Sequence, residues 1–139
     1  YILDTEADIR FMTHQENHLL GVSVEGNMDL DGNGTIDVVI GASGMAPPSR
    51  GDVSEADMFG MDSPGDVYLY WGESLSLGVH DIEDAPVHME GEERMDHVGI
   101  KVTSPGDVNA DGADDLLVGT ERGQYGVGRA YLLTGLRAP

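Results

Sequence analysis

Short runs of apolar and β-branched residues recur along the whole chain, and turn-forming residues separate them. Residues 20–24 alternate between apolar and polar positions, whereas residues 36–40 and 67–71 are mostly apolar or aromatic. No segment keeps the apolar period of about 3.6 residues that an amphipathic helix shows. The pattern predicts an all-β fold with strands at residues 9–13, 20–24, 36–40, 67–71, 87–89, 98–102, 116–118 and 130–133. Residues 73–84 are expected to form a connecting loop with room for one helical turn.

The second half of the chain repeats the first half. The stretch Asp29–Asp37 matches Asp107–Asp115 at an offset of 78 residues. The same offset relates three further pairs, Ala7–Phe11 and Ala85–Met89, Gly21 and Gly99, and Gly41 and Gly119. Residues 66–72 resemble residues 129–135 at an offset of only 63, so the first repeat carries 15 extra residues. We therefore expect one unit over residues 1–139, with four strands per repeat. Repeat 1 spans about 7–84 with an insertion within 45–64, and repeat 2 spans about 85–139.

Each repeat contains a nine-residue loop with oxygen-bearing side chains at positions 1, 3, 5 and 9. Side chains at alternating positions can converge on one centre, and the Gly at position 6 permits a tight turn. Hard oxygen ligands without His or Cys favour Ca²⁺ over zinc or copper. Position 7 is expected to contribute its backbone carbonyl. The predicted ligands of two Ca²⁺ ions per chain are Asp29, Asp31, Asn33, Thr35 and Asp37 in the first loop, and Asp107, Asn109, Asp111, Ala113 and Asp115 in the second.

Two other interpretations of these loops are possible. An EF-hand requires Glu at position 12, and that position holds Ile40 in the first loop and Val118 in the second. The EF-hand is therefore excluded. A metal-free turn rich in Asp, Asn and Gly is the remaining alternative, since these residues are common in turns. The matched spacing in both repeats favours Ca²⁺, with the weak affinity of about 10⁻⁴ to 10⁻³ M that is typical of extracellular modules.

The charge of the chain limits its partners. Seven basic residues oppose 26 acidic ones, which gives a net charge of −19. We therefore predict no binding to nucleic acid or to anionic membranes, both of which need clusters of Lys and Arg. No apolar run has the length of a membrane span, and the absence of Cys excludes disulfides and thiolate sites. No catalytic signature is present, so we predict a non-catalytic protein, and we expect its His residues on the surface.

These residues resemble the FG-GAP repeat of integrin-α-like β-propellers. Leu20-Gly21 and Val98-Gly99 stand where the family has its Phe-Gly pair, and Gly41-Ala42-Ser43 and Gly119-Thr120-Glu121 stand at its Gly-Ala-Pro end. The chain departs from both namesake motifs, whereas its calcium loops fit closely. The resemblance implies propeller blades of four antiparallel strands and Ca²⁺ between strands 1 and 2 on one face. It also implies a protein or glycan ligand on the opposite face, and an extracellular or cell-surface location.

Two blades cannot close a propeller ring, so the chain is expected to be either an excised fragment or a homo-oligomer. A trimer of six blades is favoured over a dimer of four. In such a ring, the strand at residues 9–13 would complete the last blade of a neighbouring chain, beside residues 130–133.

The function expected from this reasoning is a protein-binding or adhesion scaffold. A carbohydrate-binding propeller that uses aromatic residues such as Trp71 is one alternative, and an accessory region of a larger secreted enzyme is another. The integrin-binding tripeptide Arg50-Gly51-Asp52 lies in the insertion, but three residues carry little weight. The apolar residues Met45, Met58, Phe59 and Met61 of the insertion either pack locally or contact a partner.

Overall fold

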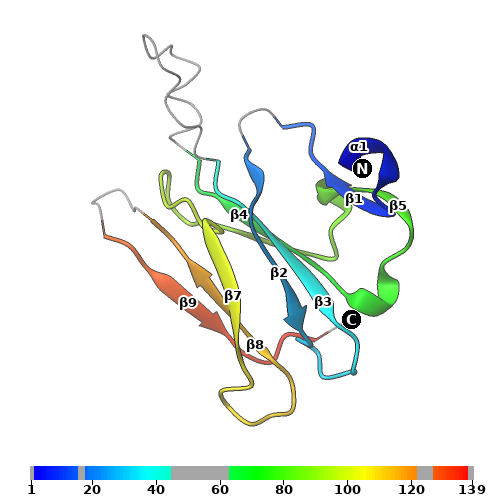
Figure 1. Ribbon diagram of the computed structural model, residues 1–139. Helices are drawn as coiled ribbons and strands as arrows, with labels where there is room; N and C mark the ends of the chain where they lie inside the picture. The colour runs from blue at the N-terminus through cyan, green and yellow to red at the C-terminus, as the bar shows by residue number, and fades with distance from the viewer. Residues whose placement is uncertain (1, 16–17, 45–62, 122–126, 138–139) are drawn as a thin grey trace.

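The computed structural model describes residues 2–15, 18–44, 63–121 and 127–137, and their fold is mostly β (Figure 1). A four-stranded antiparallel sheet has the order β2-β3-β4-β6, with β2 at Leu20–Met28, β3 at Asp37–Ala42, β4 at Asp66–Tyr70 and β6 at Val87–Glu90. A three-stranded antiparallel sheet contains β7 (Lys101–Gly106), β8 (Asp115–Gly119) and β9 (Ala130–Leu133). The predicted antiparallel β structure is therefore confirmed.

The remaining elements form a small third layer. Helix α1 (Leu3–Glu6) precedes β1 (Ile9–Met12), which pairs in parallel with β5 (Gly78–Asp81). Short 3₁₀ helices η1 (Gly72–Ser74) and η2 (Ile82–Asp84) flank β5. Strand β5 lies inside the segment that we expected to be a loop. The pairing of β1 with β5 within one chain also differs from the expected pairing of residues 9–13 with a neighbouring chain, which a single chain does not test.

Strands β2 and β7 differ most from the bounds predicted from the sequence. Strand β2 continues to Met28, four residues beyond the predicted end, because a register shift after Glu25 lets the pairing with β3 continue. Strand β7 begins at Lys101 rather than at residue 98. The positive φ angles of His97 and Gly99 turn the backbone away from an extended conformation just before β7, so ladder pairing starts later.

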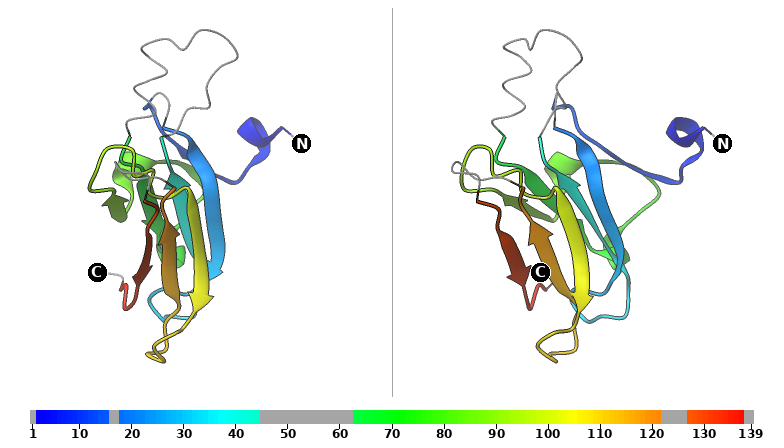
Figure 2. Two further views of the ribbon diagram at one scale, coloured as in Figure 1. Left: turned by 90° about the vertical axis from the view of Figure 1, so that its left-hand side faces the viewer. Right: turned by 60° about the vertical axis from the view of Figure 1, so that its left-hand side comes forward.

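The two antiparallel sheets pack face to face, with β2 and β7 side by side (Figures 1 and 2). We call the side of each sheet that faces the other sheet its inner face, and the opposite side its outer face. The inner faces enclose the main core, formed by Met28, Leu30, Val39, Val67, Leu69, Trp71, Val98, Val102, Leu116 and Val118. On the outer face of the four-stranded sheet, the β1–β5 pair and η2 cover a second core of Ile40, Ala42, Tyr68, Tyr70 and Ile82.

Glycines allow the backbones of the two sheets to approach closely. A Cβ atom on Gly41 would overlap the carbonyl oxygen of Gly99, and that same oxygen accepts a hydrogen bond of 2.6 Å from the Ser23 hydroxyl. Gly99 has a φ of +81°, in the left-handed region that glycine adopts without a steric penalty. Gly65 makes an isolated parallel bridge to Val98 in the same region. These contacts fix the spacing of the two sheets.

Replacement of Gly41 by Ala should destabilise the fold. We expect the free energy of unfolding to fall by about 2–3 kcal/mol or more, because the added Cβ would displace the Gly99 carbonyl and the Ser23 hydroxyl that donates to it. The matched control is Gly26→Ala in β2, where an added Cβ would lie 4.0 Å from the nearest atom and φ is not positive. Urea denaturation of both variants measures the difference. Equal stability of the two variants would contradict the close contact.

Candidate metal centre

The loop between β2 and β3 brings three predicted ligands together. Ligand oxygens of Asp29, Asp31 and Asp37 all lie within 4.8 Å of one another. Like charges this close repel, so the ionised loop is strained electrostatically unless a cation or protons neutralise it. Among the described residues, this is the one group of three or more acidic, His or Cys side chains that meets this distance.

Backbone N–H groups shape the first loop around its side chains. Asp29 accepts hydrogen bonds from the N–H of Asn33 at 3.0 Å and of Gly34 at 2.7 Å. Asp31 accepts from the Asn33 N–H, and the Asn33 side-chain oxygen accepts from the Thr35 N–H at 2.7 Å. The alternating side chains therefore turn toward the interior of the loop, as the spacing predicts. The predicted roles of the Thr35 and Ala113 carbonyls as ligands stay predictions.

Asp37 anchors the first loop at the start of β3. It is fully buried, and it accepts hydrogen bonds from the N–H of Leu30 at 2.8 Å and of Gly72 at 2.9 Å. Burial raises the pKa of Asp37, and the negative charges of Asp31 and Glu73 raise it further, although the two N–H groups oppose this shift. A carboxylate in this position gains from a cation nearby, which would remove the cost of holding its charge.

The second loop repeats the backbone hydrogen bonds within the first loop, but among the described residues Asp115 has no counterpart of the bond from the Gly72 N–H to Asp37. Asp107 accepts from the N–H of Asp111 at 3.1 Å and of Gly112 at 2.9 Å. The Asn109 side-chain oxygen accepts from the Asp111 N–H, and Asp111 accepts from the Ala113 N–H. Asn109 supplies an amide oxygen where the first loop has the Asp31 carboxylate, so the second loop has one charge fewer at that position.

Asp115 is the counterpart of Asp37 and provides the test of whether a cation fits. Its side chain is 0% exposed, and one oxygen accepts from the Val108 N–H at 2.8 Å. The other oxygen, Oδ1, accepts no hydrogen bond from any described residue. A buried carboxylate oxygen without a donor is costly, and coordination to a cation would satisfy it. The donor set of carboxylate and amide oxygens fits Ca²⁺.

The two loops lie at the same end of the molecule and touch (Figure 1). The Asp29 N–H donates to the Asp114 carboxylate at 2.9 Å, and the Asp114 N–H donates to the Asp29 carbonyl at 2.8 Å. This double contact joins the loops of the two repeats. Their carboxylates therefore form one strongly acidic region at this end of the molecule.

Comparison with known proteins adds no assignment to this geometry. No protein-family model matches the chain, and no curated protein matches it.

A second polar cluster was not recognised from the sequence. His18 Nε2 lies 2.8 Å from one oxygen of Asp66, and His88 Nε2 lies 2.6 Å from the other. The ring of His88 stacks on Tyr68, with 4.7 Å between the ring centroids. His18 is buried, as is His97, so the prediction that the His residues lie on the surface was wrong for both. The sequence offered no signal for the cluster, because its members lie far apart in the chain.

Burial opposes ionisation of Asp66, but the hydrogen bonds from His18 and His88 outweigh it and lower the pKa of the carboxyl. The charged Asp66 therefore stabilises the fold above its ordinary pKa of 3.8, and this contribution is lost as pH falls through the lower pKa of the folded state.

Arg50-Gly51-Asp52 and the apolar residues of the insertion, Met45, Met58, Phe59 and Met61, lie outside the described residues, so the predictions made for them stay predictions.

Within the part of the chain that the structure describes, no helix is long and apolar enough to span a membrane.

Replacement of Asp66 by Asn should destabilise the fold in a pH-dependent way. At pH 5–7 we expect a loss of about 2–3 kcal/mol, because two ring N–H groups lose a charged acceptor. The loss should shrink below about pH 3.8, where the unfolded-state carboxyl protonates. Urea denaturation from pH 2 to 7 measures it, with Asp84→Asn at an exposed position as the control. A loss that stays constant across this range would contradict the role of the Asp66 charge.

Proposed function

We propose that this chain is a calcium-binding segment of a β-propeller that acts as a non-catalytic scaffold for protein binding or adhesion. One observation carries the calcium assignment. Two loops at equivalent positions share one hydrogen-bond pattern, and each ends in a fully buried Asp. The orphaned Oδ1 of Asp115 supports a cation in the second loop, and the clustered carboxylates of the first loop support one there.

In this proposal Ca²⁺ supplies positive charge where the loops gather negative charge. Asp29, Asp31, Asn33 and Asp37 would hold the ion of the first loop, and Asp107, Asn109, Asp111 and Asp115 that of the second. The buried Asp37 and Asp115 join each loop to the strand that follows it, β3 or β8. An ion that binds only the folded loops would stabilise the fold by mass action.

The arrangement of the sheets supports the propeller assignment. The four-stranded sheet is an antiparallel meander of the size of one propeller blade. The first strands of the two repeats, β2 and β7, lie side by side, as the innermost strands of adjacent blades do. The three-stranded sheet corresponds to a second blade without its fourth strand. By the offset of 78 residues, β1 is the repeat counterpart of β6, the fourth strand of the first sheet.

The scaffold role has more support than the alternatives. A glycan-binding site usually presents aromatic rings to solvent, and Trp71, Tyr68 and Tyr70 are buried. Tyr131, at 37% exposure, is the aromatic residue that remains for a carbohydrate-binding role among the described residues. An accessory role in a larger secreted enzyme is compatible with the same module. An extracellular location suits weak Ca²⁺ sites, because such modules work at high free Ca²⁺.

Calcium should stabilise the chain through both loops. At a concentration of about 100 times Kd, we expect Ca²⁺ to raise the free energy of unfolding by about 2.7 kcal/mol per site. Calorimetry should find two sites in the wild type and one in Asp29→Asn or in Asp107→Asn, because both loops have a carboxylate at this first position. Asp29 and Asp107 are not buried, so loss of a charge there should leave the metal-free fold intact.

Two controls separate coordination from charge screening. Asp84→Asn removes an exposed carboxylate outside the loops and should retain two sites. NaCl at matched ionic strength should stabilise the chain much less than CaCl₂. Equal stabilisation by the two salts, or two sites in every variant, would overturn the calcium assignment.

A further inference from the structure

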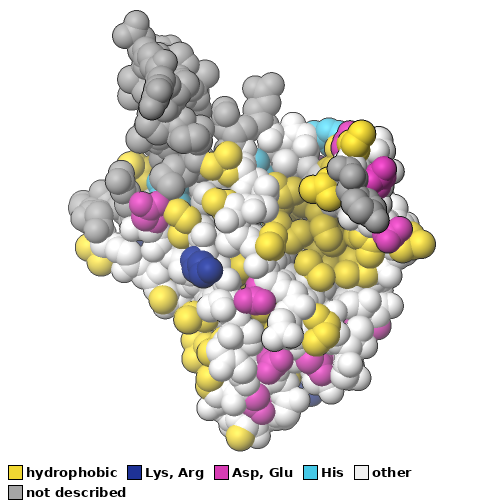
Figure 3. Space-filling view, in the orientation of Figure 1, with side chains coloured by type: hydrophobic (Ala, Val, Ile, Leu, Met, Phe, Trp, Pro, Cys, Tyr) yellow, Lys and Arg dark blue, Asp and Glu magenta, His cyan; other side chains and the backbone are white. Residues whose placement is uncertain are grey.

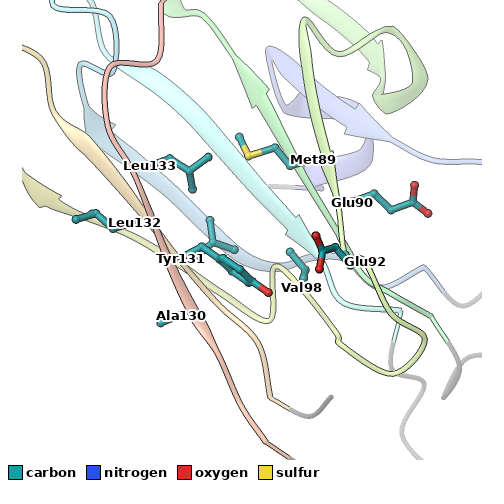
Figure 4. Close-up of a pocket in the computed structure, with 10 residues that line it drawn as sticks. Met89, Glu90, Glu92, Val98, Ala130, Tyr131, Leu132 and Leu133 are labelled. Atoms are coloured by element: carbon teal, nitrogen blue, oxygen red, sulfur yellow. The ribbon is translucent and has the colours of Figure 1, made fainter. Parts of the chain in front are cut away.

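A groove of about 520 Å³ separates the outer strands of the two antiparallel sheets (Figure 4). It lies between β6, with the turn that follows it, and β9. In Figure 4, Leu133 and Tyr131 point across the groove toward Met89 and Val98, whereas Leu132 points away from it. The walls are thus mainly apolar, and the charged Glu90 and Glu92 lie at one side.

The repeat shows what fills the equivalent space in the four-stranded sheet. The groove residues Val118, Tyr131 and Leu133 are the repeat counterparts of Ile40, Tyr68 and Tyr70. In the four-stranded sheet, those three counterparts pack against Ile82 of η2, which is 1% exposed. Strand β6 follows η2 and pairs with the outer edge of β4. A helical turn followed by a strand therefore covers this position in the first repeat.

The N-terminal arm, defined here as Ile2–Met12, has the same order of elements as that covering segment. Its helix α1 precedes β1, as η2 precedes β6, and Ala7–Phe11 matches Ala85–Met89 in the repeat. Ile2 and Leu3 of the arm are 65% and 78% exposed, although they are large apolar residues. Among the described strands, none pairs with the free edge of β9.

The arm of the same chain does not reach this groove. Strand β1 lies on the outer face of the four-stranded sheet, on the opposite side of the molecule from β9 (Figures 1 and 2). We propose that the groove between β6 and β9 receives the N-terminal arm of a second copy of this chain. This inference rests on the proposed blade relation between the repeats. Strand β1 of the second copy pairs with β9, and its Ile2 and Leu3 enter the groove.

The sheet faces that are exposed in one chain are the repeat counterparts of the two faces that pack against each other in its main core. Leu117, Leu132 and Val108 on the three-stranded sheet and its loop are the counterparts of Val39, Leu69 and Leu30. The latter three are fully buried between the sheets, whereas Leu132 and Val108 are about half exposed. The outer face of the three-stranded sheet therefore resembles a face that the chain buries elsewhere.

The four-stranded sheet exposes the complementary face. Val24 on β2 is 65% exposed, whereas its repeat counterpart Val102 is 2% exposed in the main core. A space-filling view shows a broad apolar patch in the area of β3 and the β1–β5 pair (Figure 3). The outer face of the three-stranded sheet of one copy would therefore pack against the outer face of the four-stranded sheet of the other. This contact would resemble the one that the two repeats already make within one chain. Such a contact joins different surfaces of the two copies, head to tail.

The positions of the glycines support the same contact between two copies. Gly119 and Gly21 are the counterparts of Gly41 and Gly99, which meet between the two sheets. In the single chain, a Cβ on Gly21 would meet no atom within 4 Å, and one on Gly119 would lie 3.6 Å from its nearest neighbours. Gly21 nevertheless has a φ of +85°, close to the +81° of Gly99. Each chain thus carries both halves of a second glycine contact, which a second copy would bring together.

Docking requires the arm to leave its own chain. Four residue pairs join β1 to β5 in parallel, and Phe11 packs on Tyr70 with 4.6 Å between ring centroids. These contacts must break before the arm can dock, so docking exchanges a two-stranded parallel pair for a place in a larger antiparallel sheet. Addition of β1 to β9 would extend a three-stranded antiparallel sheet and bury Ile2 and Leu3. Assembly should therefore increase with protein concentration.

Engineered cysteines test the position of the arm, because the chain has no Cys of its own. The pairing of Leu69 with Val87 in the first repeat corresponds to Leu132 with Ile9 of a second copy. The double variant Ile9→Cys/Leu132→Cys should form disulfide-linked multimers on oxidation. The matched control Ile9→Cys/Val108→Cys places the second thiol at another exposed apolar residue, in the second loop, and should not. Equal cross-linking of both variants, or none in either, would overturn the proposed docking.

Light scattering during size exclusion tests the same contact without cysteines. The wild type should show three times the monomer mass at high concentration, and Gly119→Ala should remain monomeric with unchanged thermal stability of the monomer. Gly26→Ala is the control and should assemble like the wild type. A wild type that is monomeric at every concentration, or Gly119→Ala that assembles normally, would overturn the proposal. Two-site calcium binding by a monomer would leave the proposed function intact, so the two failures are distinguishable.

Discussion

The structure depends on two buried carboxylates, each at the point where a loop enters a strand. Asp37 and Asp115 are fully buried, and each accepts a backbone N–H from the start of its own loop. This bond closes the nine-residue loop and sets where β3 or β8 begins. The strands that follow the two loops, β3 and β8, each pair with a neighbouring strand on both sides. The free energy of the whole unit therefore depends on how the charge of these two groups is compensated.

The inward turn of the side chains in the two nine-residue loops could be predicted from the sequence because the information for it is local. Spacing within nine residues determines which side chains converge, and the hydrogen bonds of both loops follow that spacing. Most strands were also predictable, since short β-branched runs such as residues 36–40 differ clearly from the Gly- and Asp-rich turns around them. The repeat then relates each strand of the second sheet to one of the first.

Features that depend on distant contacts could not be predicted in this way. Strand β5 has no alternating pattern of its own, and it exists because β1 lies alongside it. His18 looked like an ordinary surface residue, yet its partners Asp66 and His88 come from two strands of the folded sheet. Burial of a polar side chain follows from tertiary packing, and a single sequence does not encode it in any local pattern.

The backbone contact between the two loops would couple the proposed calcium sites. Asp29 is a predicted ligand of the first loop, and its own N–H and carbonyl hold Asp114 of the second. An ion that orders one loop would also restrict the backbone of the other. The second ion would then bind a loop that has less conformational entropy left to lose. The two sites would then bind cooperatively and reciprocally. Occupancy would rise over a narrower range of calcium concentration than two separate loops allow, which converts a pair of weak sites into a threshold response.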